Sequence, residues 1–122
     1  MTMIINYFRL IGDSEKALER TEEFLKPWQQ GEESFWVDIH SYDTDELEAW
    51  LDNLNLSDLA IRCCLEAGQA ARFIPLREEV FFECTVYTEG AQSDIVNLAF
   101  LCIRNLVITL HPAPIPRLDG VI

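Results

Sequence analysis

The sequence DIVNLAFLCIRNLVITLH, residues 94–111, is the most apolar stretch of this chain. It could form either a membrane-spanning helix or a pair of strands. As a helix, residues 95–110 would extend roughly 24 Å at 1.5 Å per residue, which is less than the ~30 Å hydrocarbon layer of a bilayer. A spanning helix would also bury the charge of Arg104 beside the amide of Asn105. Both arguments disfavour a membrane span.

Two strands account for the same stretch. It is rich in β-branched residues, which favour strands, and Asn105 tolerates the positive φ that a short hairpin turn requires. Each strand would be apolar on both faces, as expected in the middle of a sheet that is covered on both sides. We therefore predict a central β-hairpin that turns at Arg104 and Asn105.

The composition predicts a single domain over residues 1–122. Of these 122 residues, 49% are hydrophobic, which is enough for one core. The formal net charge of −12 argues against nucleic acid and anionic membrane surfaces as partners, because their phosphates would be repelled. It is compatible with cations or basic partners. Most acidic residues fall in predicted helices, where solvated helix faces explain them.

The amino-terminal residues and the cysteines point to a reducing compartment. The start MTMIINYFRL has neither a basic leader nor a small-residue cleavage site, so we expect no signal peptide. The four cysteines lie within predicted strands and a predicted helix, where free, buried thiols are expected. We expect no segment of this chain to insert into a bilayer by itself.

The first part of the chain is predicted to alternate between strand and helix. Alternating apolar residues predict a strand at residues 3–11, and a dense aromatic and β-branched run predicts another at 35–39. Between them, helical spacing of apolar residues predicts a helix that begins at Asp13 or Ser14 and that Pro27 ends after Lys26.

Two further helices carry capping signals. Asp43 with Glu46 three positions later has the pattern of a capping box, and Asn55 can close the helix that follows. Ser57 or Asp58 can cap the next helix, and Gly68 can stop it.

The second part of the chain is predicted to be mostly strand. We expect an edge strand at 71–76 because it contains Pro75, a strand at 80–87, a loop at 88–93 and then the hairpin. Three prolines follow His111, so the tail should leave the sheet. The predicted fold class is α/β (α+β), with a mixed sheet of about six strands and helices packed against it.

In this order, several segments resemble the amino-terminal cytosolic domain of the CorA-like divalent-cation transporters. The likeness covers residues 35–111 and rests on the order of the segments more than on any one motif. Phe35-Trp36-Val37-Asp38-Ile39 is similar to the family's Trp-hydrophobic-Asp/Asn strand, Leu56 to Leu65 takes the place of its His-Pro-Leu-x-x-Glu-Asp helix, Val80-Phe81-Phe82 stands where its Tyr-x-Phe strand follows an Arg-Pro-Lys stretch, and residues 101–109 are similar to its closing Lys-Asn hairpin.

The resemblance implies a non-enzymatic domain on the cytoplasmic side of the cell membrane. Family members transport magnesium or a related ion such as cobalt or zinc, and they form pentamers in which this domain makes the mouth of a funnel. Cation at the subunit seams holds the pore shut. Self-assembly and divalent cations are therefore the implied partners. The family's stalk helix, two membrane spans and Gly-Met-Asn signature are not among residues 1–122. The chain would be either part of a longer protein or a stand-alone relative.

The sequence departs from the family where a cation-sensing carboxylate is expected. Arg62-Cys63 stands in place of the family's Glu-Asp, and neither residue offers a hard oxygen ligand for magnesium. Ser57-Asp58 stands in place of His-Pro, and Ala71-Arg72-Phe73 in place of Arg-Pro-Lys.

The candidate ligands for Mg²⁺, the one cofactor considered, are four carboxylates close together in sequence. Carboxylate oxygens suit this ion when several converge, although Asp38 could instead bond nearby backbone and Asp43 and Glu46 could simply cap a helix. No closed ligand spacing is present. The candidates are Asp38, Asp43, Asp45 and Glu46.

Other chemistry has less support in the sequence. A zinc site would need His40 or His111 to meet a cysteine, and no paired metal-binding motif is present. Nucleophilic catalysis lacks a recognisable motif, and the three tryptophans are expected as core or interface anchors. Two alternatives to a transporter domain remain, namely a stand-alone soluble module that binds a protein partner and, last in order, a small enzyme.

Overall fold

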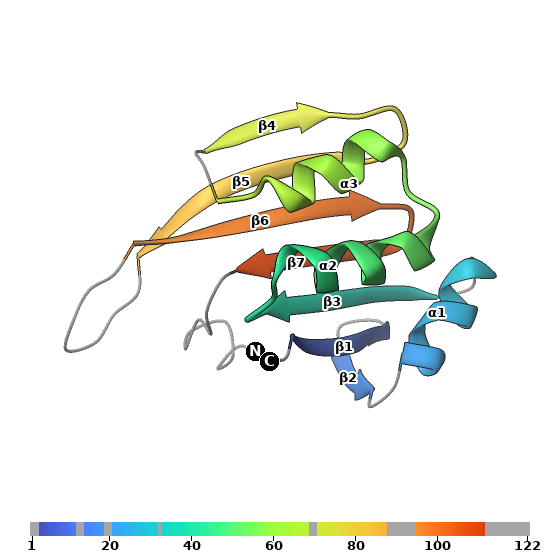
Figure 1. Ribbon diagram of the computed structural model, residues 1–122. Coiled ribbons are helices and arrows are strands. Elements are labelled where there is room, and N and C mark those ends of the chain that lie inside the picture. Colours follow the sequence, from blue (N-terminus) through green and yellow to red (C-terminus); the bar gives the residue numbers. More distant parts are fainter. Residues whose placement is uncertain are drawn as a thin grey trace.

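The computed structural model describes residues 3–11, 14–18, 21–31, 33–68, 71–87 and 95–111. A mixed sheet and the helices on one of its faces make up this part of the chain (Figure 1). Its elements are β1 (Ile4–Ile11), β2 (Ser14–Leu18), α1 (Thr21–Gln29), β3 (Ser34–His40), α2 (Thr44–Leu51), the 3-10 turn η1 (Asp52–Leu54), α3 (Asp58–Leu65), β4 (Arg72–Pro75), β5 (Val80–Tyr87), β6 (Ile95–Ile103) and β7 (Leu106–His111).

The predicted central hairpin is confirmed. Strands β6 and β7 pair in antiparallel fashion with Ile103 opposite Leu106, so Arg104 and Asn105 form the turn, and Asn105 has a φ of 60°. The strand order is β2-β1-β3-β7-β6-β5-β4, with β7 in the middle and parallel to β3. None of the helices in the described ranges is long and apolar enough to cross a membrane.

The predicted helix from Asp13 or Ser14 is wrong in its first part. Residues Ser14–Leu18 form β2, which pairs with β1 and adds a seventh strand to the predicted six. The register sets Ile11 opposite Ser14, so only Gly12 and Asp13 connect the two strands. A two-residue Gly-Asp connection is typical of a hairpin. Pairing with β1 therefore outweighs the helical spacing of the apolar residues in this segment.

The prediction that Pro27 ends the first helix is also wrong. Helix α1 runs from Thr21 to Gln29 with Pro27 inside it. Trp28, beyond the proline, stacks on Phe24 with ring centroids 5.8 Å apart and donates from Nε1 to the carbonyl oxygen of Arg104 at 2.9 Å. The ring stack within α1 and the tertiary hydrogen bond of Trp28 to Arg104 compensate for the one backbone hydrogen bond that proline removes.

The predicted N-cap residues of α2 and α3 are confirmed, but the reciprocal half of the capping box is not, because Glu46 accepts from the backbone nitrogen of Met3. Asp43 accepts a hydrogen bond from the backbone nitrogen of Glu46 at 2.8 Å, and Ser57 accepts one from Ala60 at 3.1 Å. Asn55 closes η1 after α2, as predicted, and has a φ of 56° in the left-handed region. The predicted edge position of β4 is confirmed too, whereas the predicted loop at 88–93 and the proline-rich tail lie outside the described residues.

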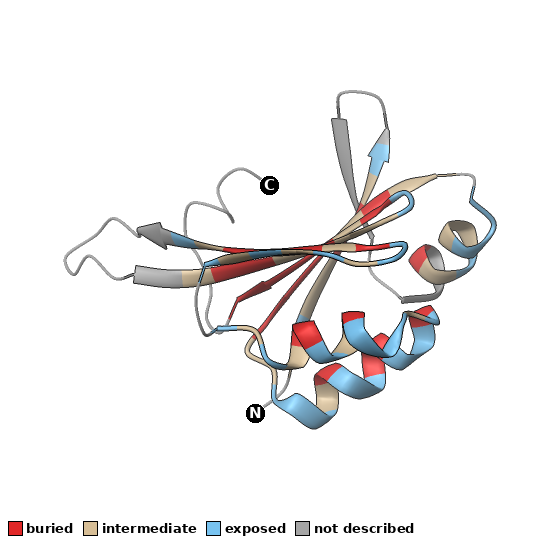
Figure 2. Ribbon diagram, turned by 90° about the horizontal axis from the view of Figure 1, so that it is seen from above, coloured by how far each residue is buried: buried red, intermediate tan, exposed pale blue. Residues whose placement is uncertain are grey.

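The core lies between the helices and one face of the sheet (Figure 2). Helices α2 and α3 lie together on this face, and α1 adds Phe24, which is 5.2 Å from Phe35 and 5.6 Å from Tyr7 between ring centroids. Alternate residues of the central strands point to this side and are fully buried. They include Phe35, Val37, Ile39, Phe81, Leu101, Ile108 and Leu110.

The opposite face, which we call the open face, carries no helix of the described residues. It remains apolar: Phe82 and Phe100 stack with centroids 4.5 Å apart, and Phe8 packs on Trp36 at 5.2 Å. Phe73, at its margin, is 67% exposed. The prediction that helices cover the hairpin is therefore confirmed on one face only.

Candidate functional site

A buried polar cluster lies at the carboxyl ends of the parallel strands β3 and β7, on the open face. Asp38 and Thr109 are opposite each other in these strands, and His40 is opposite His111. Asp38 and His111 are fully buried, Thr109 is 2% exposed and His40 is 5% exposed. Buried charged side chains are rare unless they are paired, so this cluster is the first candidate for a functional site.

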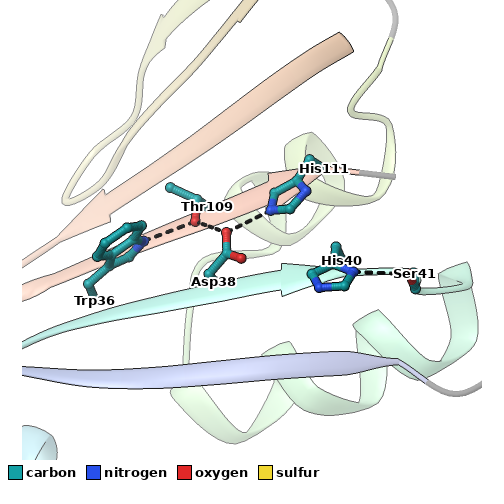
Figure 3. A network of polar contacts seen from close by, with 6 residues as sticks. All are labelled: Trp36, Asp38, His40, Ser41, Thr109 and His111. Atoms are coloured by element: carbon teal, nitrogen blue, oxygen red, sulfur yellow. Dashed lines mark hydrogen bonds and ion pairs between the residues drawn. The ribbon is translucent and has the colours of Figure 1, made fainter. Parts of the chain in front are cut away.

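The hydrogen bonds of the cluster run in one direction (Figure 3). The indole nitrogen of Trp36 donates to Thr109 Oγ1 at 3.0 Å, and Thr109 donates in turn to Asp38 Oδ1 at 2.5 Å. His111 Nε2 lies 2.8 Å from the same Asp38 oxygen. Because an indole N–H can only donate, the Thr109 hydroxyl is left to donate to Asp38. Asp38 Oδ1 therefore accepts from both Thr109 and His111, and Thr109 in turn accepts from Trp36.

The two histidines of the chain lie against each other in this cluster. Their rings stack with centroids 5.2 Å apart and planes inclined by 24°. His40 Nδ1 lies 3.0 Å from Ser41 Oγ, and Ser41 has a φ of 58°, which is unusual for a residue other than glycine. Asp38 bonds to His111 and not to His40, so serine, histidine and aspartate do not form the relay that activates a nucleophile.

The cluster is built to join strands. Asp38, His40, Thr109 and His111 are nearly inaccessible to solvent. Two cavities in the described part of the chain, one beside Trp28 and one beside Tyr42, are not lined by the cluster. Asp38 Oδ2 is buried and has no hydrogen-bond partner in the described part of the chain. The arrangement links β3 to β7 through side chains in addition to the backbone ladder, which is a structural role for Asp38 and His111.

The four predicted magnesium ligands do not converge. Asp38 points to the open face, whereas Asp43 caps α2 and Glu46 accepts from the backbone nitrogen of Met3 at 3.4 Å. Asp45 is exposed in the first turn of α2. No group of three or more His, Cys, Asp or Glu side chains that could hold a metal ion occurs in the described ranges. Magnesium binding by these residues stays a prediction.

The cap hydrogen bond changes the acidity of Asp43. The backbone N–H of Glu46, donating to the carboxylate, is the main reason that the pKa of Asp43 lies below its ordinary value of 3.8. This is the expected effect of a hydrogen bond to the charged form. The shift belongs to helix capping and does not by itself indicate a ligand.

The cysteines are free and do not approach the histidines as a metal-binding group in the described ranges. Cys63 and Cys64 are buried on α3, and burial raises the pKa of Cys64 to about 12. Such thiols are protonated at neutral pH and poor ligands or nucleophiles. The free, buried state predicted for the cysteines is confirmed for this pair, whereas Cys84 and Cys102 are only half-buried.

The three tryptophans are anchors, as predicted. Trp50 is buried and donates to the Tyr7 hydroxyl at 3.0 Å, while Trp28 and Trp36 are half-buried and donate to the Arg104 carbonyl and to Thr109. Each indole N–H thus has a partner, which is the usual requirement for burying this side chain. Sequence reasoning missed these partners because each lies at least 43 residues away along the chain.

No protein-family model and no curated protein matches the sequence. Solved structures do. The full-length CmaX protein matches 97% of this chain at 23% identity with a TM-score of 0.75, and the soluble domain of CorA from Methanocaldococcus jannaschii matches 97% at 14% identity with a TM-score of 0.66. The cytoplasmic domain of ZntB from Vibrio parahaemolyticus RIMD 2210633 matches 98% at 15% identity with a TM-score of 0.73.

These likenesses establish the fold. The chain has the α+β architecture of the CorA soluble domain, so the resemblance predicted from the sequence is confirmed at the level of the fold. In each case the chain spans less than half of the matched protein, namely 37% of CmaX, 44% of the CorA soluble domain and 47% of the ZntB domain.

Proposed function

We propose that this chain is the cytosolic assembly and regulatory domain of a CorA-like transporter of magnesium or a related divalent cation. The observation that carries the proposal is that nearly the whole chain matches one part of longer proteins. One of them is the complete structure of the CorA magnesium transporter from Methanocaldococcus jannaschii, in which the match covers 99% of this chain and 36% of the transporter chain. The proposed role is non-catalytic, and the proposed location is the cytoplasmic side of the cell membrane.

The one-sided covering of the sheet supports this proposal. A sheet buries an apolar face only against another layer, and the open face carries large apolar side chains without a described helix over them. Exposed apolar patches mark surfaces that bind another part of a protein or a partner. In a larger assembly, another part of the protein or a partner would cover the apolar open face.

The cation response expected of such a domain needs a different location in this chain. Arg62 is exposed and Cys63 is buried on α3, and neither supplies a hard oxygen ligand at the family's position. We place any response to magnesium on the acidic segment 43–48 at the start of α2, where Asp43, Asp45 and Glu48 are exposed.

A magnesium titration tests that placement. If magnesium binds the folded protein and not the unfolded chain, adding millimolar magnesium raises the melting temperature. The double variant Asp45→Asn, Glu48→Gln should abolish this rise. Sodium chloride that is free of calcium, at the same ionic strength, is the control for electrostatic screening by the added salt. An unchanged melting temperature in the parent chain would remove the local cation response and leave the fold untouched.

The transport proposal itself is tested on the natural gene. The reading frame should continue past Ile122 into a long charged helix, two apolar spans and a Gly-Met-Asn signature, and cells lacking other magnesium uptake should grow on low magnesium when they express it. A stop codon directly after Ile122 would overturn the proposal. It would favour the alternative, a stand-alone module whose open face and exposed Phe73 bind a protein partner.

A further inference from the structure

A second polar site lies on the helix-covered side of the sheet, away from the Asp38 cluster. It is a cavity of about 240 Å³ between the residues after β3, the end of α3 and strands β5 to β7. Its polar lining comes from Tyr42, Glu83 and Asn97, and its apolar lining from Ala67, Ala99 and Leu110. It is independent of the function proposed above.

Glu83 is the charged group of this cavity. Its side chain is fully buried, and Oε1 lies 2.7 Å from Arg72 Nε, whereas Oε2 accepts from the backbone nitrogen of Gly68 at 2.8 Å and from Asn97 Nδ2 at 2.7 Å. Three donors to one carboxylate hold it in one position. The site therefore has a fixed negative charge that Arg72 balances from one side.

The contact with Glu83 also orients Asn97. Because Nδ2 donates to the carboxylate, Oδ1 must point elsewhere. Asn97 Oδ1 is buried and has no hydrogen-bond partner in the described part of the chain. A buried acceptor without a donor is unfavourable, which calls for a donor at this oxygen.

Tyr42 completes the polar wall. Burial is the main reason that the pKa of the Tyr42 hydroxyl lies above its ordinary value of 10.0, so the hydroxyl is protonated at physiological pH, and the charge of Glu83 adds to the shift. The Tyr42 oxygen, Asn97 Oδ1 and the Glu83 carboxylate can all accept a hydrogen bond. The lining of the cavity thus combines residues that carry acceptors with apolar side chains.

We propose that this cavity binds a small primary ammonium ion on a short aliphatic chain. A primary ammonium has three N–H donors and no acceptor, which matches the acceptor set, and its chain fits the apolar wall. A neutral alcohol supplies one donor only. A divalent cation needs six or more oxygen ligands, whereas the lining of this cavity contains a single carboxylate.

Nuclear magnetic resonance of the 122-residue protein tests the proposal with n-propylammonium chloride as the probe. The side-chain amide of Asn97 and the backbone amide of Gly68 both donate to Glu83, so their resonances report on the cavity. Saturable shifts are expected with n-propylammonium. Tetramethylammonium, which has the charge but no N–H donor, should leave these resonances in place, and 1-propanol should bind about tenfold more weakly or worse, as expected for loss of a charged hydrogen bond.

Variants locate the binding site. Tyr42→Phe removes one acceptor and should weaken n-propylammonium binding several-fold without filling the cavity. Ala99→Leu should fill it and abolish binding, whereas Ala49→Leu on the exposed side of α2 is the matched control and should bind as the parent does. The proposal is overturned by the absence of saturable shifts with n-propylammonium, by equal shifts with tetramethylammonium or 1-propanol, or by unchanged binding in Tyr42→Phe.

Discussion

Asp38 illustrates what a buried carboxylate contributes to this fold. It lies on a strand between fully buried neighbours, and the donors to its Oδ1 come from the neighbouring strand β7. When one member of a buried polar pair is removed, its partner is left without a hydrogen bond. The resulting loss of stability is larger than the net contribution of the pair. The stability of the β3–β7 junction therefore depends on Asp38.

Asp38→Ala is expected to lower the free energy of unfolding by about 3 kcal/mol, because Thr109 and His111 lose their acceptor. Thr109→Val, which leaves only the Trp36 N–H without a partner, should cost about 1–2 kcal/mol. Urea denaturation followed by tryptophan fluorescence gives both values. Asp45→Ala, on an exposed position, is the control; an Asp38→Ala midpoint equal to that of the control would contradict a structural role for this carboxylate.

The acidity of Asp43 gives a pH-dependent prediction. Its pKa is lowered in the folded protein, chiefly by the Glu46 N–H, so the ionised cap stabilises α2 fully above pH 3.8 and loses this contribution as the pH falls through the lower folded value. The stability difference between the parent and Asp43→Ala should be full at pH 7 and should narrow below about pH 4. Circular dichroism melts across that range measure it, and a difference that grows toward acid pH would show that the sign is wrong.

Sequence reasoning succeeded at these residues where the partner is close in the chain. The caps at Asp43 and Ser57 bond three residues ahead, so the local pattern suffices to predict them. Asp38 meets His111 across 73 residues, and that contact exists only because β3 pairs with β7 in parallel. The sequence marks Asp38 as a carboxylate in a strand but does not indicate which strand lies beside it, so its partners could not be predicted.

At the level of the elements, the β6–β7 hairpin organises the sheet. Asn105 holds the left-handed conformation at the turn, and its carbonyl oxygen accepts from the backbone nitrogen of Phe35 at 2.9 Å, which joins the turn to the start of β3. The turn residue, the β-branched strands and the charge of Arg104 all point to a hairpin. Agreement between local preference and tertiary structure explains why this element was predictable.

Asn105→Val should lower the free energy of unfolding by about 1–2 kcal/mol, because a β-branched residue is strained at a φ of 60°. Asn105→Gly should be close to neutral, since glycine adopts this conformation freely. Chemical denaturation of both variants measures the contrast. Equal stability of the two would mean that the turn does not depend on the conformation of this residue.

The first helix shows where element prediction failed. Residues 14–28 carry apolar side chains at helical spacing, yet Ser14–Leu18 extend the sheet beside β1 and only Thr21–Gln29 are helical. The preference of a short segment is weak, and pairing with an available strand edge outweighs it. The Gly12-Asp13 pair was the sequence signal for a hairpin at this point.

At the scale of the whole molecule, the described structure is a sheet with helices on one side. The helix-covered face holds the aromatic core, and the open face holds half-buried apolar side chains and the Asp38 cluster. Its fold matches parts of longer proteins, and within the described residues no helix covers the open face. We therefore expect the open face to be covered in the natural protein.

The native cysteines provide the most direct measurement of this central claim. Cys84 and Cys102 are half-buried on the open face, whereas Cys63 and Cys64 are buried under the helices. In the 122-residue chain, N-ethylmaleimide should alkylate Cys84 and Cys102 well before Cys63 and Cys64, and in the full-length membrane transporter that we propose, Cys84 and Cys102 should be protected. Equal alkylation of Cys84 and Cys102 in the chain and in the full-length transporter would contradict the account.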